Sequence, residues 1–169
     1  NYSQRDKFIV DADISHGIVN LSELELMTGR QLADKSNADM VGNIEFAGNI
    51  NGSSNNMIYK GHMISNIGIV NIDGNAIMTN ERITVNSRLY SKGMDFSLIS
   101  DGLIGPLAFD SEINGFVERD SSLFAQIDGN VEHITLKGYR YNKIYFNGFT
   151  NKRQGNVLVE MHDPNGNIN

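Results

Sequence analysis

Residues 128–148 have the sequence DGNVEHITLKGYRYNKIYFNG, and this stretch decides the class of fold. Large apolar side chains recur at every second position, first at Ile134 and Leu136 and then at Ile144 and Phe146. A period of two is typical of a strand with one apolar and one polar face. The stretch therefore predicts two neighbouring strands.

The same alternation continues towards both ends of the chain, with Asn, Ser, Thr, Asp, Glu or Lys between the apolar positions. We expect the alternating apolar residues, here called the parity set, to share one face of an antiparallel sheet. The parity set is Ile44, Phe46, Ile83, Val85, Met94, Phe96, Leu98, Leu107, Phe109, Ile134, Leu136, Ile144, Phe146, Val157, Val159 and Met161. The predicted fold is all-β: a long antiparallel sheet curled into an open apolar groove (a β-taco), with one short helix near residues 27–35. A closed barrel or sandwich core is the other interpretation of the same pattern.

Pairs of Asn or Asp with Gly separate many of these runs. Such pairs favour tight hairpin turns, although some can lie inside strands as bulges. They are Asn51-Gly52, Asp73-Gly74, Asp101-Gly102, Asn114-Gly115, Asp128-Gly129 and Asn165-Gly166.

Two blocks of the chain resemble each other, which predicts an internal repeat. Residues 42–52 (GNIEFAGNING) match residues 105–115 (GPLAFDSEING) at an offset of 63, since 105 follows 42 by that number. We therefore expect leading strands and the helix in 1–41 and five-stranded groove repeats in 42–104 and 105–169. The strands predicted in the first repeat are 43–50, 57–66, 67–78, 82–90 and 93–99. Repetition favours stacking along an axis over closure.

Composition excludes several classes of protein. The net charge of −6 argues against a nucleic-acid partner, which would need basic residues to neutralise phosphates. The chain has no Cys, so a disulfide scaffold and a thiolate metal site are excluded. The first residues resemble neither an initiating Met nor a signal peptide, and we expect the chain to be a fragment of a larger protein.

A family resemblance rests on residues within 128–148 and on a short motif near residue 164. Gly138-Tyr139-Arg140-Tyr141 with Ile144 and Gly148, and then Asp163-Pro164-Asn165, resembles the GYxYxxI…G…DPN pattern of TamB proteins of the Bacteroides type. Residues 40–44, with Asn51-Gly52, are also similar to that family, and the resemblance covers residues 18–166. TamB belongs with the AsmA-like and bridge-like lipid-transfer proteins.

The resemblance implies an inner-membrane anchor outside this chain, a periplasmic β-groove that shields phospholipid acyl chains between inner and outer membranes, and support of outer-membrane protein assembly. It also implies an outer-membrane barrel of the Omp85 type as partner, through parts of the parent protein not present here. The parity set would then line the lipid path. No cofactor and no catalytic residue is expected, so we predict that the chain is not an enzyme.

Other candidate sites have simpler explanations. The four His residues (His16, His62, His133 and His162) lack metal-site spacing, and residues 71–75 resemble a plain turn more than a calcium loop. Asp101 and Asp110 could be considered as a carboxylate pair, but positions in a turn and on the outer face of a strand explain both residues. The aromatic residues Tyr139, Tyr141, Tyr145 and Phe149 suit cross-strand packing or sugar stacking. Met57, Met63, Met78, Met94 and Met161 suit either a core or a lipid-facing surface.

Two functions from different classes are consistent with these features: a lipid-conducting groove module, or a structural or adhesive β-solenoid that binds no lipid. They differ in whether the apolar face is covered by protein or left open.

Overall fold

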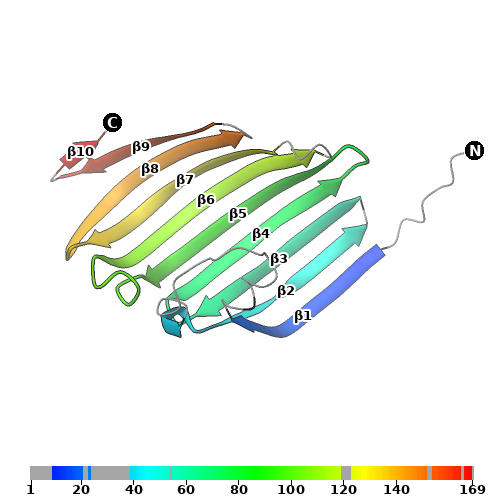
Figure 1. The fold of residues 1–169 in the computed structure, drawn as a ribbon, viewed down its shortest axis with the longest axis horizontal. Coiled ribbons are helices and arrows are strands. Elements are labelled where there is room, and N and C mark those ends of the chain that lie inside the picture. The colour runs from blue at the N-terminus through cyan, green and yellow to red at the C-terminus, as the bar shows by residue number, and fades with distance from the viewer. Residues whose placement is uncertain are drawn as a thin grey trace, which may run out of the picture.

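The protein is a single antiparallel sheet in the computed structural model (Figure 1). The structure describes residues 9–20, 23, 39–53, 55–118, 123–151, 154–164 and 166–168. The strands are β1 (Ile9–Asn20), β2 (Asn43–Ser53), β3 (Asn56–Ser65), β4 (Gly68–Met78), β5 (Arg82–Asp95), β6 (Ile104–Glu118), β7 (Leu123–Leu136), β8 (Tyr139–Asn151), β9 (Gly155–Asp163) and β10 (Gly166–Ile168). The all-β prediction is confirmed.

Strands that are consecutive in the chain lie side by side in the sheet, in the order β1 to β10, and each pair is antiparallel. Short turns allow this arrangement. Lys137 and Gly138 alone join β7 to β8, and both have positive φ (49° and 80°), the backbone that matches the twist of a two-residue hairpin. Asn66 and Ile67 join β3 to β4 in the same number of residues.

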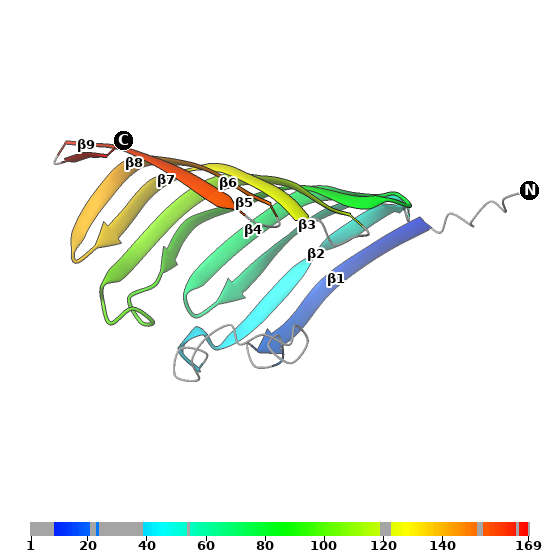
Figure 2. The same ribbon diagram turned by 45° about the horizontal axis from the view of Figure 1, so that its top comes forward.

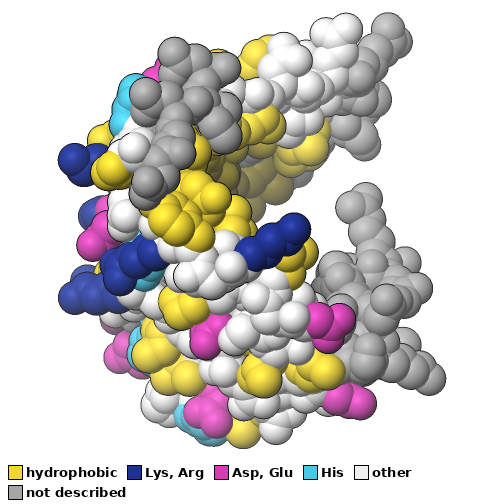
Figure 3. All heavy atoms as spheres, turned by 90° about the vertical axis from the view of Figure 1, so that its left-hand side faces the viewer, with side chains coloured by type: hydrophobic (Ala, Val, Ile, Leu, Met, Phe, Trp, Pro, Cys, Tyr) yellow, Lys and Arg dark blue, Asp and Glu magenta, His cyan; other side chains and the backbone are white. Residues whose placement is uncertain are grey.

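The sheet is curled but not closed, because β1 and β10 each have one neighbour only. Figure 2 shows the ribbon arched across the strands, and the space-filling view in Figure 3 is hollowed on one side. Register shifts between Ile14 and Gly17 and between Ser91 and Met94 place extra residues on one strand of a pair. Such bulges bend a strand and increase its twist, which favours curling.

The strand predicted over 93–99 is wrong. Strand β5 ends at Asp95, and residues 96–103 form a loop closed by backbone hydrogen bonds from Ile99 N to Phe96 O (3.1 Å) and from Gly102 N to Ser97 O (2.9 Å). Residues 42–104 therefore contain the four long strands β2–β5 and the start of β6 rather than five complete strands. The division into two repeats stays a prediction.

The helix predicted near residues 27–35 lies outside the described residues. Within them, residues 39–41 form a short helical turn before β2. At the end of β1, Asn20 and Glu23 exchange backbone-to-side-chain hydrogen bonds of 3.0 and 2.8 Å. This reciprocal pair of hydrogen bonds has the geometry of a capping box.

Most of the Asn-Gly and Asp-Gly pairs do not form hairpin turns. Asp73-Gly74, Asn114-Gly115 and Asp128-Gly129 lie inside β4, β6 and β7 in regular register, and Asn51-Gly52 lies inside β2. Among the described pairs, only Asp101-Gly102 makes a turn with two positive φ values (51° and 74°), in the β5–β6 loop. The pair Asn165-Gly166 is left aside because residue 165 is outside the described residues. Alternation in the four strands puts the Asn or Asp on one face and the Gly on the other.

Candidate functional site

The candidate site is the face of the sheet that carries the parity set, here called the apolar face. Cross-strand partners point to the same face of a sheet, so the register assigns each residue to a face. Phe46 pairs with Met63, Met94 with Leu107, and Leu107 with Ile134. The register puts the whole parity set on the apolar face except Phe96 and Leu98, which lie in the β5–β6 loop. For those two residues the expectation is wrong, because the strand ends before them.

One row of side chains crosses the apolar face from β2 to β9, perpendicular to the strands, and is here called the apolar row. It consists of Phe46, Met63, Val70, Ser91, Phe109, Val131, Ile144 and Met161. With strands spaced about 4.8 Å apart, seven steps give the row a length of about 34 Å measured along the sheet. Seven of these eight side chains are apolar; the exception is Ser91 on β5, whose hydroxyl is hydrogen-bonded to Ile69 O. Val70 lies at the register shift between β4 and β5.

Aromatic rings lie over glycines of adjacent strands on this face. Phe46 pairs directly with Gly17, where an added Cβ would come within 2.5 Å of ring atom Cε1. Phe146 pairs with Gly129, where a Cβ would come within 2.6 Å of Cζ. The rings therefore lie across the backbone of the neighbouring strand, in the space a side chain would otherwise fill. This explains the glycine of the Asp128-Gly129 pair.

Hydroxyl groups on the apolar face are bonded within the sheet. Ser91 Oγ donates to Ile69 O at 2.6 Å, and Ser111 Oγ donates to Leu89 O at 3.1 Å. The hydroxyls of Tyr59 and Ser87 also share a hydrogen bond. These hydroxyls are satisfied by protein partners, so they add little polarity to the surface.

The apolar face is partly exposed. Among the described residues, the buried hydrophobic side chains are Ile67, Ala108 and Met161, and none of the large side chains is fully buried. Strand contacts are made chiefly between neighbours in the sheet, as expected for one layer. A packed second layer would bury a face of this size, whereas here most of the parity set keeps intermediate exposure.

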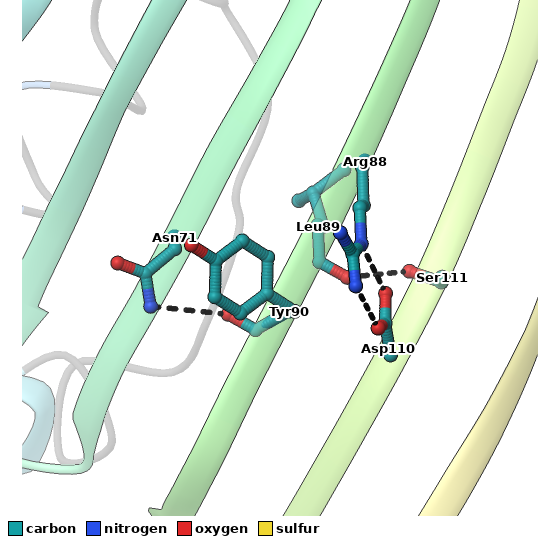
Figure 4. A network of polar contacts seen from close by, with 6 residues as sticks. All are labelled: Asn71, Arg88, Leu89, Tyr90, Asp110 and Ser111. Carbon is teal, nitrogen blue, oxygen red and sulfur yellow. Dashed lines mark hydrogen bonds and ion pairs between the residues drawn. The ribbon is translucent and has the colours of Figure 1, made fainter.

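The opposite face, here called the polar face, carries the charged residues of the central strands. Arg88 on β5 forms two hydrogen bonds with the carboxylate of Asp110 on β6, at 2.8 and 2.5 Å (Figure 4). The Arg88 guanidinium also lies over the ring of Tyr90, 5.2 Å from its centroid. In Figure 3, charged side chains gather on the outer side of the curled sheet.

The Arg88–Asp110 pair shifts both titrations. The hydrogen bonds from Arg88 lower the pKa of the Asp110 carboxyl below its usual value, and the Asp110 carboxylate raises the pKa of the Arg88 guanidinium. Both side chains are more than a third exposed, so solvent screens the pair and its effect on stability is small. The pair ties β5 to β6 on the polar face.

On the apolar face, Asp163 near the end of β9 is the charged exception among the described strand residues. Its side chain is buried and accepts hydrogen bonds from Tyr139 Oη (2.8 Å) and Asn142 N (3.1 Å). Both carboxylate oxygens therefore have protein donors, which offsets the cost of burying a charge. Asp163 fixes the end of β9 against β8.

The structure divides the other candidate residues between the two faces. All five methionines named above lie on the apolar face. Tyr139 and Tyr141 lie there with ring centroids 4.5 Å apart, whereas Tyr145 and Phe149 lie on the polar face, so the four aromatic residues are not one cluster.

Residues 71–75 lie within β4, so the turn predicted there is wrong. Asp101 lies in the β5–β6 loop while Asp110 pairs with Arg88 in the sheet, so the structure does not bring the two carboxylates together as a pair.

The four His residues lie on four different strands, β1, β3, β7 and β9. Among the described residues, no group of three or more His, Cys, Asp or Glu side chains could hold a metal ion. His133 Nδ1 is buried without a hydrogen-bond partner at the β7 register shift. An open hollow of about 670 Å³ lies near the same region, lined by Glu132, Asn142, Lys143, His162, Asp163 and Pro164.

No protein-family model, curated protein or solved structure matches the chain. In the described part, no helix is long and apolar enough to cross a membrane. The fold defines the class: an open, curled antiparallel sheet. The polar face also has exposed apolar side chains, among them Ile58, Ile69 and Leu158. The resemblance to TamB proteins and the absence of catalysis stay predictions.

Proposed function

We propose that the apolar face forms an open groove that shields phospholipid acyl chains, as a periplasmic module of a TamB-like envelope protein. The observation that carries the proposal is the apolar row, which runs across β2–β9 and is not covered by a second layer among the described residues. The satisfied hydroxyls and the charges on the polar face support it. On this proposal the parity-set residues of the strands contact the lipid.

The length of the apolar row and the free energy of binding favour movement of an acyl chain along the face over tight binding. The row, about 34 Å long, exceeds the roughly 15 Å that acyl chains of one leaflet span, since the hydrocarbon core is about 30 Å thick. Full burial of a methylene gains about 0.8 kcal/mol, so ten half-covered methylenes gain about 4 kcal/mol. This corresponds to affinity near the millimolar range. A chain held so weakly can move along the face.

Headgroup recognition is not part of the proposal. Among the described residues, the apolar face has no Arg or Lys within the regular register of its strands, and its acidic exception, Asp163, is already hydrogen-bonded. A phosphate would therefore remain in water at the edge of the groove. The parent protein would supply the membrane anchor and the contact with an Omp85-type barrel.

The direct test places a photocrosslinking amino acid at one of two adjacent positions. Val131 lies on the apolar row, and Asn130, the residue before it, lies on the polar face. We expect phospholipid crosslinks from position 131 and few from position 130, in cells and with added phospholipid. Phe109 pairs directly with Val131, so Phe109→Asp should reduce crosslinking at 131 because a carboxylate resists burial against acyl chains. Asn114→Asp, on the polar face of the same strand, is the control.

The structural β-solenoid remains the alternative. A folded protein with no lipid crosslinks from position 131, or with equal crosslinks from 130 and 131, would refute the lipid proposal. Circular dichroism and thermal unfolding of each variant establish that the sheet is intact.

A further inference from the structure

The pairing of β7 with β8 is interrupted at one position. The register pairs residue 131 with 144 and residue 133 with 142, and Glu132 and Lys143 lie between these paired positions. The register between β6 and β7 also shifts at this level, between Ala108 and Phe109. Irregularities of this kind bend a strand and redirect side chains, and they are frequent beside functional sites.

The backbone at Lys143 has a conformation that is unusual inside a strand. Its φ is 56°, whereas the other two described non-glycine residues with positive φ, Asp101 and Lys137, lie between strands. Left-handed backbone is unfavourable for a residue with a Cβ. On the neighbouring strand, His133 Nδ1 is buried without a hydrogen-bond partner. A strained residue close to an unsatisfied polar atom is more typical of a binding site than of a regular sheet.

An open hollow of about 670 Å³ lies at this irregularity. Its volume is within the range of ligand sites in proteins, which is about 300 to 1,000 Å³. Strands β7, β8 and β9 and the residue after β9 all contribute to it. The lining residues are Glu132, Asn142, Lys143, His162, Asp163 and Pro164.

Opposite charges line the hollow without neutralising one another. Glu132, Lys143 and His162 are exposed, and within the described residues none of the three forms an ion pair or a side-chain hydrogen bond. Asp163 differs, because it is buried and both of its carboxylate oxygens accept hydrogen bonds from protein donors. The lining therefore offers one carboxylate, one ammonium group and one imidazole to a ligand.

We propose that this hollow binds a small zwitterion, a molecule with an anionic oxygen group and an ammonium group a few bonds apart. Lys143 and His162 contact the anionic group, and Glu132 contacts the ammonium group. An anion alone would be repelled by Glu132 and Asp163, and a cation alone would be repelled by Lys143. A ligand that carries both charges complements both sides of the hollow.

Phosphoethanolamine has this chemistry and is the probe. We expect the NMR signals of the His162 imidazole and the Lys143 side chain to shift and saturate at about millimolar concentration, because exposed charge pairs stabilise a complex weakly. At constant pH and ionic strength, inorganic phosphate and ethanolamine should each bind about fivefold more weakly, since each forms one of the two charge contacts. His62 on β3 is the internal control and should not shift.

Substitutions separate the two charge contacts. Glu132→Gln should remove the preference for phosphoethanolamine over phosphate without weakening phosphate binding, and Lys143→Gln should weaken both. Glu112→Gln, at an exposed position on β6 outside the lining, is the matched control and should keep the preference. Circular dichroism establishes that each variant is folded. No saturable shift of the unsubstituted chain up to about 50 mM, or equal binding of phosphate and phosphoethanolamine, would overturn the proposal.

The zwitterion has two possible sources, a free solute or the headgroup of phosphatidylethanolamine. Nanodiscs that contain this lipid distinguish them: shifts at His162 with nanodiscs assign the headgroup, and shifts with soluble phosphoethanolamine alone assign a free solute. The site does not depend on acyl chains in the apolar groove. The Val131 crosslink is measured with Glu132 and Lys143 unchanged, so either proposal can fail alone.

Discussion

The contact between Phe46 and Gly17 gives the sharpest test of how the apolar face is built. In Gly17→Ala, the new Cβ would overlap the Phe46 ring, and the three nearest atoms to it all belong to that ring. The ring must then leave its place over β1. If a third of an aromatic surface of about 200 Å² becomes exposed, the loss is about 1.6 kcal/mol at 25 cal/mol per Å².

Alanine also has a favourable effect, because replacing Gly restricts the unfolded chain and gains about 0.4 to 1 kcal/mol where the backbone permits it. The net destabilisation by Gly17→Ala is therefore about 0.6 to 1.2 kcal/mol. In a Phe46→Ala background the ring is gone, and the same substitution should stabilise the protein. The expected coupling energy is about 1.6 kcal/mol.

Urea unfolding of the four proteins in this double-mutant cycle measures the coupling. Gly155→Ala on the same face is the control: its nearest atom would lie 3.5 Å away, so it should not destabilise either background. If Gly17→Ala stabilises the chain that retains Phe46, or if the coupling is below about 0.5 kcal/mol, the ring does not lie over Gly17 and the reasoning about the face is wrong.

Three further predictions concern polar groups. Asp110→Asn should lower the midpoint of urea unfolding slightly at pH 7. Because Arg88 lowers the pKa of Asp110 in the folded protein, the difference from wild type should shrink below about pH 4. An equal difference at about pH 3 would contradict this. Ser91→Ala removes the 2.6 Å bond to a carbonyl of β4 and should cost about 1 to 2 kcal/mol; an unchanged unfolding midpoint would argue against that bond. Ser100→Ala should speed hydrogen exchange of the Ile104 amide, whereas exchange at the rate of the wild type would mean that the loop is held by other contacts.

Local alternation was enough to predict which residues share a face. Alternation is a local property, since each peptide step in a strand turns the side chain to the opposite side. Ile134 with Leu136 and Ile144 with Phe146 were assigned correctly to one face across a turn that sequence did not identify. The methionines obey the same rule. The all-β class and most of the candidate face were therefore predictable.

The point where alternation ends and the role of the glycines depend on contacts between distant parts of the chain. Phe96 and Leu98 continue the pattern of Met94, yet β5 stops at Asp95, because the Asp95 carboxylate and the Ser100 hydroxyl stabilise a loop instead. Gly129 comes after Asp128 as in a hairpin turn, but its role is to accommodate a ring from the next strand. Such contacts join residues distant in sequence, and the backbone conformation at an Asp-Gly pair depends on them. The curl and the open edges also depend on the register of whole strands, which no short stretch contains.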